Sequence, residues 1–316
     1  MKVVVTGAAG YIGGQTLLKL TDAGHDVLAI DRVMPPGHLM TAPCSWHTGD
    51  FASDLGLDAI KLFCPDAIVH CAGTSLVGPS MDNPREYYNN NFVKTKILLD
   101  FLVDNHYKKV RFVFSSSAAV YGNPIMTPVQ EVDPTEPISP YGESKLMVDW
   151  MLRRYAQAYG LDYVSFRYFN ACGADSLARH GQADGATHII ARVLESVKNK
   201  KDFTLYGTDY ATADGTCVRD YIHVEDLALA HVAAIDGSIP SNIYNLGTST
   251  GTSNLEVVRS AAGVTNADIA VLHGPKREGD PDTLTADAGK FMAVSSWQPR
   301  FNLTDMIAHA WAWYNK

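Results

Sequence analysis

The stretch VVVTGAAGYIGG, residues 3–14, decides the fold class. A β-branched run leads into Gly7, and Gly10 and Gly13 follow at intervals of three before a helix-like segment. Glycines at these positions permit a tight turn and a close backbone approach, while the helix N-terminus offers N–H groups and a partial positive charge to a pyrophosphate. A strand, a glycine-rich turn and a helix in this order predict a dinucleotide-binding loop.

An acidic residue at the end of the next strand-like run supports this interpretation. Asp31 follows the glycines by roughly 20 residues, the distance that a ribose-binding acid requires. Its carboxylate would accept both ribose hydroxyls and repel a 2′-phosphate, so NAD is favoured over NADP. The neighbouring Arg32 leaves a contact with a 2′-phosphate open, although stacking on adenine or solvation is the preferred interpretation. Further strand-like runs end in GDF, with Asp50, and in HCAG, with Gly73, at the edge where such sheets bind ligands.

Short β-branched runs alternate with helix-length segments through the first half of the chain. The strand-like runs cover 2–6, 26–30, 66–72, 110–116 and 162–169, and the helix-like segments cover 12–24, 54–63, 84–105 and 141–160. Each parallel strand needs a crossover, so this alternation predicts an α/β fold with a doubly wound parallel Rossmann sheet. After about residue 170 the alternation loosens. We expect a Rossmann domain over 1–170, to which 221–246 returns, and a smaller interleaved C-terminal lobe over 171–316.

Composition excludes several classes of protein. The 316 residues carry a net charge of −8 and are 46% hydrophobic, which indicates a globular protein and argues against a nucleic-acid binder, because phosphate contacts need a concentrated basic surface. The five cysteines form no C-x-x-C pair and suit a reducing compartment. No apolar run is long enough to span a membrane. We expect a cytoplasmic protein with no membrane or metal site.

A tyrosine and a lysine stand four positions apart in SPYGESKLMVDW, residues 139–150. On a helix, Tyr141 and Lys145 share a face. A phenol needs its pKa lowered by roughly 3 units, or about 4 kcal/mol, to act as a base near neutral pH. A lysine charge about 5 Å away supplies on the order of 3 kcal/mol, and the positive ring of an oxidised nicotinamide can add the remainder.

Two neighbouring motifs turn this spacing, which is common on surface helices, into a candidate reaction centre. FSSSAAVYG ends the fifth strand-like run at the same sheet edge, where Ser117 could bind a substrate hydroxyl and relay its proton to Tyr141. In EYYNNNF, we expect Asn90 to be buried near Lys145 and to orient it; a capping or surface role is the alternative.

Together these motifs resemble the extended short-chain dehydrogenase/reductase superfamily and, within it, the family of UDP-galactose 4-epimerases, also called UDP-glucose 4-epimerases. The resemblance spans nearly the whole chain, and its most specific stretch is DGTCVRDYIHVEDLA, residues 214–228. It implies catalysis by Ser117, Tyr141 and Lys145. The NAD-binding residues that it implies are Gly7, Gly10, Tyr11, Ile12, Gly13, Asp31, Arg32, Asp50, Phe51, Cys71, Ala72, Gly73, Asn90, Ser115, Tyr141, Lys145 and Tyr168. The implied UDP-sugar contacts are Ser117, Tyr141, Asn170, His188, Ile189, Tyr206, Arg219, Arg277, Asp280 and Leu284.

The chemistry implied by the resemblance is inversion of the C4 hydroxyl of a UDP-hexose. The sugar would be oxidised to a 4-keto sugar, would turn in the pocket and would take the hydride back on its other face. Related dehydratases carry an Asp-Glu pair after the strand-five Ser or Thr, whereas Ala118 and Ala119 stand there in this chain. Elimination of water therefore lacks its general acid.

The chain departs from the family pattern at three positions. Ser75 stands where a lysine is usual near the cofactor pyrophosphate, so NAD would be held less tightly. Leu284 stands at the position that gates the sugar pocket, and its intermediate size leaves N-acetylated sugars open. Ala191 replaces a common proline and would loosen the uridine loop.

Other functions remain open at this stage. The nearest alternative is a 4-epimerase of UDP-N-acetylhexosamine, UDP-glucuronate or a UDP-pentose. A dehydrogenase that releases reduced cofactor and a non-catalytic NAD-binding regulator are further alternatives. The resemblance also implies a homodimer built from the helices near 84–105 and 141–160. Apolar residues there, such as Leu146, Trp150 and Leu152, fit packing within the subunit equally well.

Overall fold

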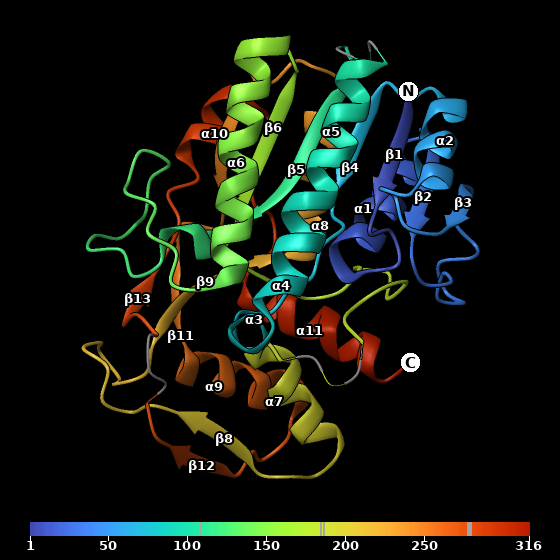
Figure 1. Ribbon diagram of the computed structural model, residues 1–316. Coiled ribbons are helices and arrows are strands. Elements are labelled where there is room, and N and C mark those ends of the chain that lie inside the picture. Colours follow the sequence, from blue (N-terminus) through green and yellow to red (C-terminus); the bar gives the residue numbers. More distant parts are fainter. Residues whose placement is uncertain (106, 108, 184, 186, 277–279) are drawn as a thin grey trace.

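A seven-stranded parallel sheet forms the centre of the fold (Figure 1). The computed structural model describes residues 1–105, 107, 109–183, 185, 187–276 and 280–316. The strands lie in the order β10 (Asn242–Leu246), β6 (Tyr163–Tyr168), β5 (Arg111–Ser117), β4 (Ala67–His70), β1 (Lys2–Thr6), β2 (Asp26–Asp31) and β3 (Ser45–Thr48). The expected α/β fold class is confirmed.

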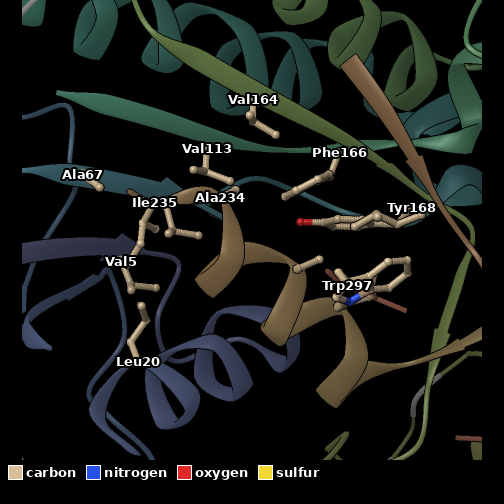
Figure 2. Close-up of a cluster of buried hydrophobic side chains, with 14 of the residues drawn as sticks. Val5, Leu20, Ala67, Val113, Val164, Phe166, Tyr168, Ala234, Ile235 and Trp297 are labelled. Atoms are coloured by element: carbon tan, nitrogen blue, oxygen red, sulfur yellow. The ribbon is translucent and has the colours of Figure 1, made fainter. Parts of the chain in front are cut away.

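The inner strands β1, β2 and β4 are buried on both faces of the sheet, which explains their continuous apolar runs. Along β1, Val3 and Val5 pack into one hydrophobic core while Val4 packs into another, as the two-residue period of a strand requires. Figure 2 shows part of the first core, in which Val164, Phe166 and Tyr168 of β6 lie on one face of the sheet.

Helices cover each face (Figure 1). The core that contains Val4 is closed by α2 (Asp54–Phe63), α5 (Lys94–Asp104) and α6 (Pro140–Tyr159). The core that contains Val3 and Val5 is closed by α1 (Tyr11–Asp22), α8 (Val224–Ala234) and α10 (Gly289–Val294). From β1 the strand order runs outward to β2 and β3 on one side and to β4, β5 and β6 on the other. The point between β1 and β4 is therefore a topological switch point, where ligands bind at the carboxyl ends of the strands.

A second lobe, seen below the sheet in Figure 1, has a hydrophobic core of its own. Its helices α7 (Ile189–Lys198), α9 (Asn254–Thr265) and α11 (Leu303–Tyr314) pack around residues such as Val193, Val257 and Ile307. Its strands are β7 (Asn170–Cys172), β8 (Phe203–Tyr206), β9 (Val218–His223), β11 (Gly251–Ser253), β12 (Val271–Gly274) and β13 (Thr283–Leu284). Strand β9 pairs with β7, β11 and β13, and β8 pairs with β12.

Several elements differ from the sequence-based expectation. Strand β3 and the short helix α3 (Val77–Asp82) were not predicted. The expected helix over 84–105 consists of α4 (Pro84–Tyr87), a π-helix η1 (Tyr88–Val93) and α5. The domain boundary at residue 170 remains a prediction. Two contacts are relevant to the expected return of 221–246 to the first domain: β10 pairs with β6, and α8 packs against α1. Within the described ranges, no helix combines the length and apolarity needed to cross a membrane.

Candidate active site

The glycine-rich loop leaves no room for a side chain at Gly7 or Gly13. Gly7 has φ of +71°, and a Cβ on it would lie 2.7 Å from the backbone N of Ala72. A Cβ on Gly13 would lie 2.1 Å from the carbonyl oxygen of Gly7. The N-cap of α1 is Gly10, which has no side chain to accept from the first N–H groups of the helix. The loop therefore fits a pyrophosphate group bound close to the backbone.

A cavity lies beside this loop, at the ends of β1, β2 and β4. Ten residues predicted for NAD line it: Gly7, Gly10, Asp31, Arg32, Asp50, Phe51, Cys71, Ala72, Gly73 and Asn90. The other lining residues, Ile30, Gly49 and Lys94, were not predicted. Of the remaining predicted residues, Ile12 packs against the first hydrophobic core, and the hydroxyl of Tyr11 donates to the carbonyl of Gly173 at 2.7 Å.

Two carboxylates hold fixed positions in this cavity. Asp31 ends β2, and its Oδ2 accepts from the N–H of Ala9 in the glycine-rich loop at 3.0 Å. Asp50 Oδ2 lies 2.5 Å from the Nζ of Lys94. Although partial burial raises the pKa of Asp50, the hydrogen bonds from Lys94 and from the backbone of Ala52 lower it below the ordinary value. Asp50 is therefore ionised and paired at neutral pH.

The three residues predicted to be catalytic lie together at the carboxyl edge of the sheet. Ser117 is the last residue of β5, and its Oγ accepts from the N–H of Ala119 at 3.1 Å. Helix α6 is capped by Ser139, whose Oγ accepts from Gly142, and this cap places Tyr141 and Lys145 on the first turns. Lys145 Nζ lies 6.0 Å from the centroid of the Tyr141 ring.

Burial dominates the protonation of this group. It raises the pKa of Tyr141, and the hydrogen bond with Ser117 lowers that pKa by less. Burial also lowers the pKa of Lys145 to about 8, against the raising influence of Cys71 and Asp149. The expected lowering of the pKa of Tyr141 is therefore not found for the protein groups alone, because burial raises this pKa above its ordinary value.

Lys145 is held by the backbone and by an aromatic face. Its Nζ donates to the carbonyl of Ser115 at 2.8 Å and lies 4.9 Å from the centroid of the Phe114 ring. Asn90 has a different partner from the one expected, since its amide donates to Thr74 Oγ1 at 2.8 Å. The neighbouring Asn91, which was not predicted, donates to Ser144 Oγ at 2.9 Å, beside Lys145. Both asparagines belong to η1, and π-helical turns occur frequently at functional sites.

Ser115 and Tyr168 form a buried network behind the lysine. The hydroxyl of Tyr168 lies 2.7 Å from Ser115 Oγ and 2.5 Å from Nε2 of His231, which sits on α8. The other ring nitrogen of His231, Nδ1, lies 2.8 Å from the carbonyl of Leu227 and donates to it. The sequence gives no signal for His231, because its partner is 63 residues away.

The expected substrate residues gather in the second lobe. A cavity there is lined by Ile189, Tyr206 and Asp280, as expected, and also by Thr187, Arg192, Phe203, Thr204, Leu205 and Asn254, which were not predicted. His188 is the exposed N-cap of α7. The guanidinium of Arg192 lies 5.6 Å from the centroid of the Tyr206 ring.

Other expected substrate residues lie on paired strands. Arg219 on β9 is aligned with Leu284 on β13, and its guanidinium lies 3.6 Å from Asp280. Asn170 on β7 donates to the carbonyl of Asp220 at 2.9 Å. Leu284 packs against the cluster that contains Ala118 and Tyr121, so it lies beside the segment that follows Ser117; Arg277 lies outside the described residues.

Comparisons with known proteins agree with this geometry. The model of a family described as NAD dependent epimerase/dehydratase family matches residues 3–247. A UDP-glucose 4-epimerase of Halalkalibacterium halodurans is 40% identical, over 100% of this chain and 96% of the relative. The crystal structure of UDP-glucose 4-epimerase from Bifidobacterium longum, in complex with NAD+ and UDP, has a TM-score of 0.91 at 34% identity and covers 100% of this chain and 98% of its own.

A relative with a broader described activity has a similar structure. The UDP-Glc/GlcNAc 4-epimerase from Campylobacter jejuni has a TM-score of 0.85 at 35% identity, over 99% of each chain. The chain therefore belongs to the NAD dependent epimerase/dehydratase family, in the branch that holds the UDP-glucose 4-epimerases.

Proposed function

We propose that the protein inverts the C4 hydroxyl of a UDP-hexose, interconverting UDP-galactose and UDP-glucose, with NAD as the bound cofactor. The observation that carries this proposal is the meeting of Ser117, Tyr141 and Lys145 at the sheet edge that also holds the glycine-rich loop. NAD, when bound, takes a hydride from the sugar C4 and returns it.

The chain's own residues handle the proton. Ser117 and Tyr141 share a hydrogen bond, so a proton from the C4 hydroxyl can pass through the Ser117 hydroxyl to the phenol oxygen. Burial raises the pKa of Tyr141, and the positive ring of a bound oxidised nicotinamide would lower it. When the hydride returns to the keto sugar, the same phenol gives the proton back.

The second lobe supplies the nucleotide site in this proposal. Ile189 and Tyr206 line its cavity, and Arg219 provides a cation for the pyrophosphate of the UDP-sugar. The small Ala118 and Ala119 follow Ser117, so no acidic side chain stands there to expel water. We therefore favour epimerisation over dehydration.

N-acetylated sugars are a second candidate substrate class. The supporting observation is Leu284, a half-buried aliphatic residue beside Ala118 and Tyr121, together with the printed activity of the Campylobacter jejuni relative. A UDP-glucuronate substrate has no comparable support among the described residues.

The proposal extends to a cytoplasmic homodimer. The outer faces of α5 and α6 support the dimer: Trp150 is 52% exposed and Ile97 is 40% exposed. Leu146 and Leu152, which also suggested an interface in the sequence, are buried within the subunit and do not contribute to it. Light scattering should give a dimer mass, and Trp150→Glu should reduce it to that of a monomer. All five cysteines are free, which supports a reducing compartment.

The test of function is NMR of the products formed from UDP-galactose, UDP-N-acetylgalactosamine and UDP-glucuronate in separate reactions, with and without added NAD. Conversion of UDP-galactose to UDP-glucose supports the proposal. A stoichiometric rise in reduced-nicotinamide absorbance would indicate a dehydrogenase instead, and no conversion of any substrate with NAD present would favour a binding role.

A further inference from the structure

The wall of the cofactor cavity contains a cation that none of the sequence motifs assigns. Lys94 is the first residue of α5, directly after the π-helix η1. Its side chain is 20% exposed and that of its partner Asp50 is 26% exposed. The Nζ to Oδ2 distance of 2.5 Å makes this a close, partly shielded ion pair within the cavity wall.

Lys94 and the backbone of Ala52 together bind both oxygens of the Asp50 carboxylate. Oδ2 accepts from Lys94, and Oδ1 accepts from the backbone N–H of Ala52 at 3.0 Å. Asn90 lies four residues before Lys94 and lines the same cavity, so the helical segment that begins in η1 presents an amide and a cation to one site.

The charges around the cavity show what Lys94 changes. Four charged side chains line it, Asp31 and Asp50 against Arg32 and Lys94, and their formal charges sum to zero. Without Lys94 the lining would carry one net negative charge, in a chain that is already at −8. A dianionic pyrophosphate would then approach a like-charged wall, and partly buried charges are weakly screened by salt.

We propose that Lys94 is a determinant of cofactor affinity, which acts by neutralising and holding Asp50 so that the cavity accepts the pyrophosphate of a dinucleotide. This inference rests on the proposed NAD-dependent function and adds a residue to it. It assigns Lys94 no direct contact with the phosphates, because its ammonium group is already committed to the Asp50 carboxylate.

A double-mutant cycle on the binding of NAD tests the mechanism. Isothermal titration calorimetry of NAD-free protein with NAD should show at least about tenfold weaker binding for Lys94→Met than for wild type, as expected for one uncompensated charge near a dianion. In the Asp50→Asn background, the same Lys94→Met change should cost less than about threefold, since there is no carboxylate left to neutralise.

Two further variants and a check of folding accompany the double-mutant cycle. Lys96→Met removes a lysine from the same helix that pairs with Asp100 outside the cavity, and it should leave NAD binding unchanged. Lys94→Gln provides a second neutral variant, and thermal unfolding checks that each variant folds.

An equal loss of NAD affinity in the wild-type and Asp50→Asn backgrounds would overturn the inference in favour of direct phosphate contact. Wild-type affinity in Lys94→Met would overturn any role for the lysine. A wild-type protein that binds no NAD would instead overturn the proposed function itself.

Discussion

Replacing the buried lysine should make the protein more stable. Lys145 is 5% exposed, and burial lowers its pKa from 10.5 to about 8. At about 1.36 kcal/mol per pKa unit, the burial of its charge costs about 3.4 kcal/mol at pH 7. Lys145→Met removes this cost but also removes the hydrogen bond to the Ser115 carbonyl, worth roughly 1.5 kcal/mol. The net expectation is a gain of about 2 kcal/mol in the free energy of unfolding, together with loss of epimerase activity.

The pH dependence of this gain gives the sharper test. The pKa of Lys145 is lower in the folded than in the unfolded protein, so the unfolded state binds more protons between about pH 8 and pH 10.5, and wild-type stability rises with pH in that window. The advantage of Lys145→Met should therefore be largest below pH 8 and shrink toward pH 10.5. Chemical denaturation of NAD-free protein, with Lys96→Met as the exposed control, measures it. A variant less stable than wild type at pH 7, or a gain that does not shrink, would refute the reasoning.

Three further predictions concern the loop, the sugar pocket and acid stability. Gly13→Ala should weaken NAD binding at least about tenfold in calorimetry, because its Cβ would lie 2.1 Å from the Gly7 carbonyl oxygen. Gly263→Ala, with open space around its Cβ in α9, should instead raise the free energy of unfolding by about 0.5–1 kcal/mol. Leu284→Tyr should lower kcat/KM for UDP-N-acetylgalactosamine more than for UDP-galactose, and equal losses would contradict its role as a gate. Four buried histidines have pKa values lowered to about 3 or about 4: His70, His180, His223 and His231. Their unfolded pKa is higher, so the unfolded state takes up protons and Tm should fall as the pH drops below about 6.5; a flat Tm from pH 6.5 to 5 would be contrary to this.

Features carried by local spacing could be predicted from the sequence. The glycine-rich loop, Asp31 and the Tyr141 and Lys145 pair each depend on a few neighbouring residues and on the strand or helix beside them. The π-helix could not be predicted, because no sequence periodicity distinguishes YNNNFV from an α-helical segment. Asn90 lies in this π-helix, and its amide donates to Thr74 Oγ1 and not to the expected partner, Lys145.

Features set by tertiary burial could not be predicted either. The field of Lys145 on Tyr141 can be computed from spacing, but the opposing desolvation depends on how completely distant segments enclose both side chains. The ion pair between Lys94 and Asp50 joins residues 44 apart in the sequence, and the Tyr168 contact with His231 joins β6 to α8. These contacts appear only once the sheet order is known.

The central claim is that one protein-bound cofactor removes and returns the same hydrogen at the sugar C4, with Tyr141 handling the proton. Deuterium NMR of UDP-galactose labelled with deuterium at C4 tests it most directly, with wild type and Tyr141→Phe compared in the presence of NAD. The account predicts UDP-glucose that retains deuterium at C4 with wild type, and a strong loss of conversion with Tyr141→Phe. Loss of the label to solvent or to free reduced cofactor, or unchanged conversion by Tyr141→Phe, would contradict it.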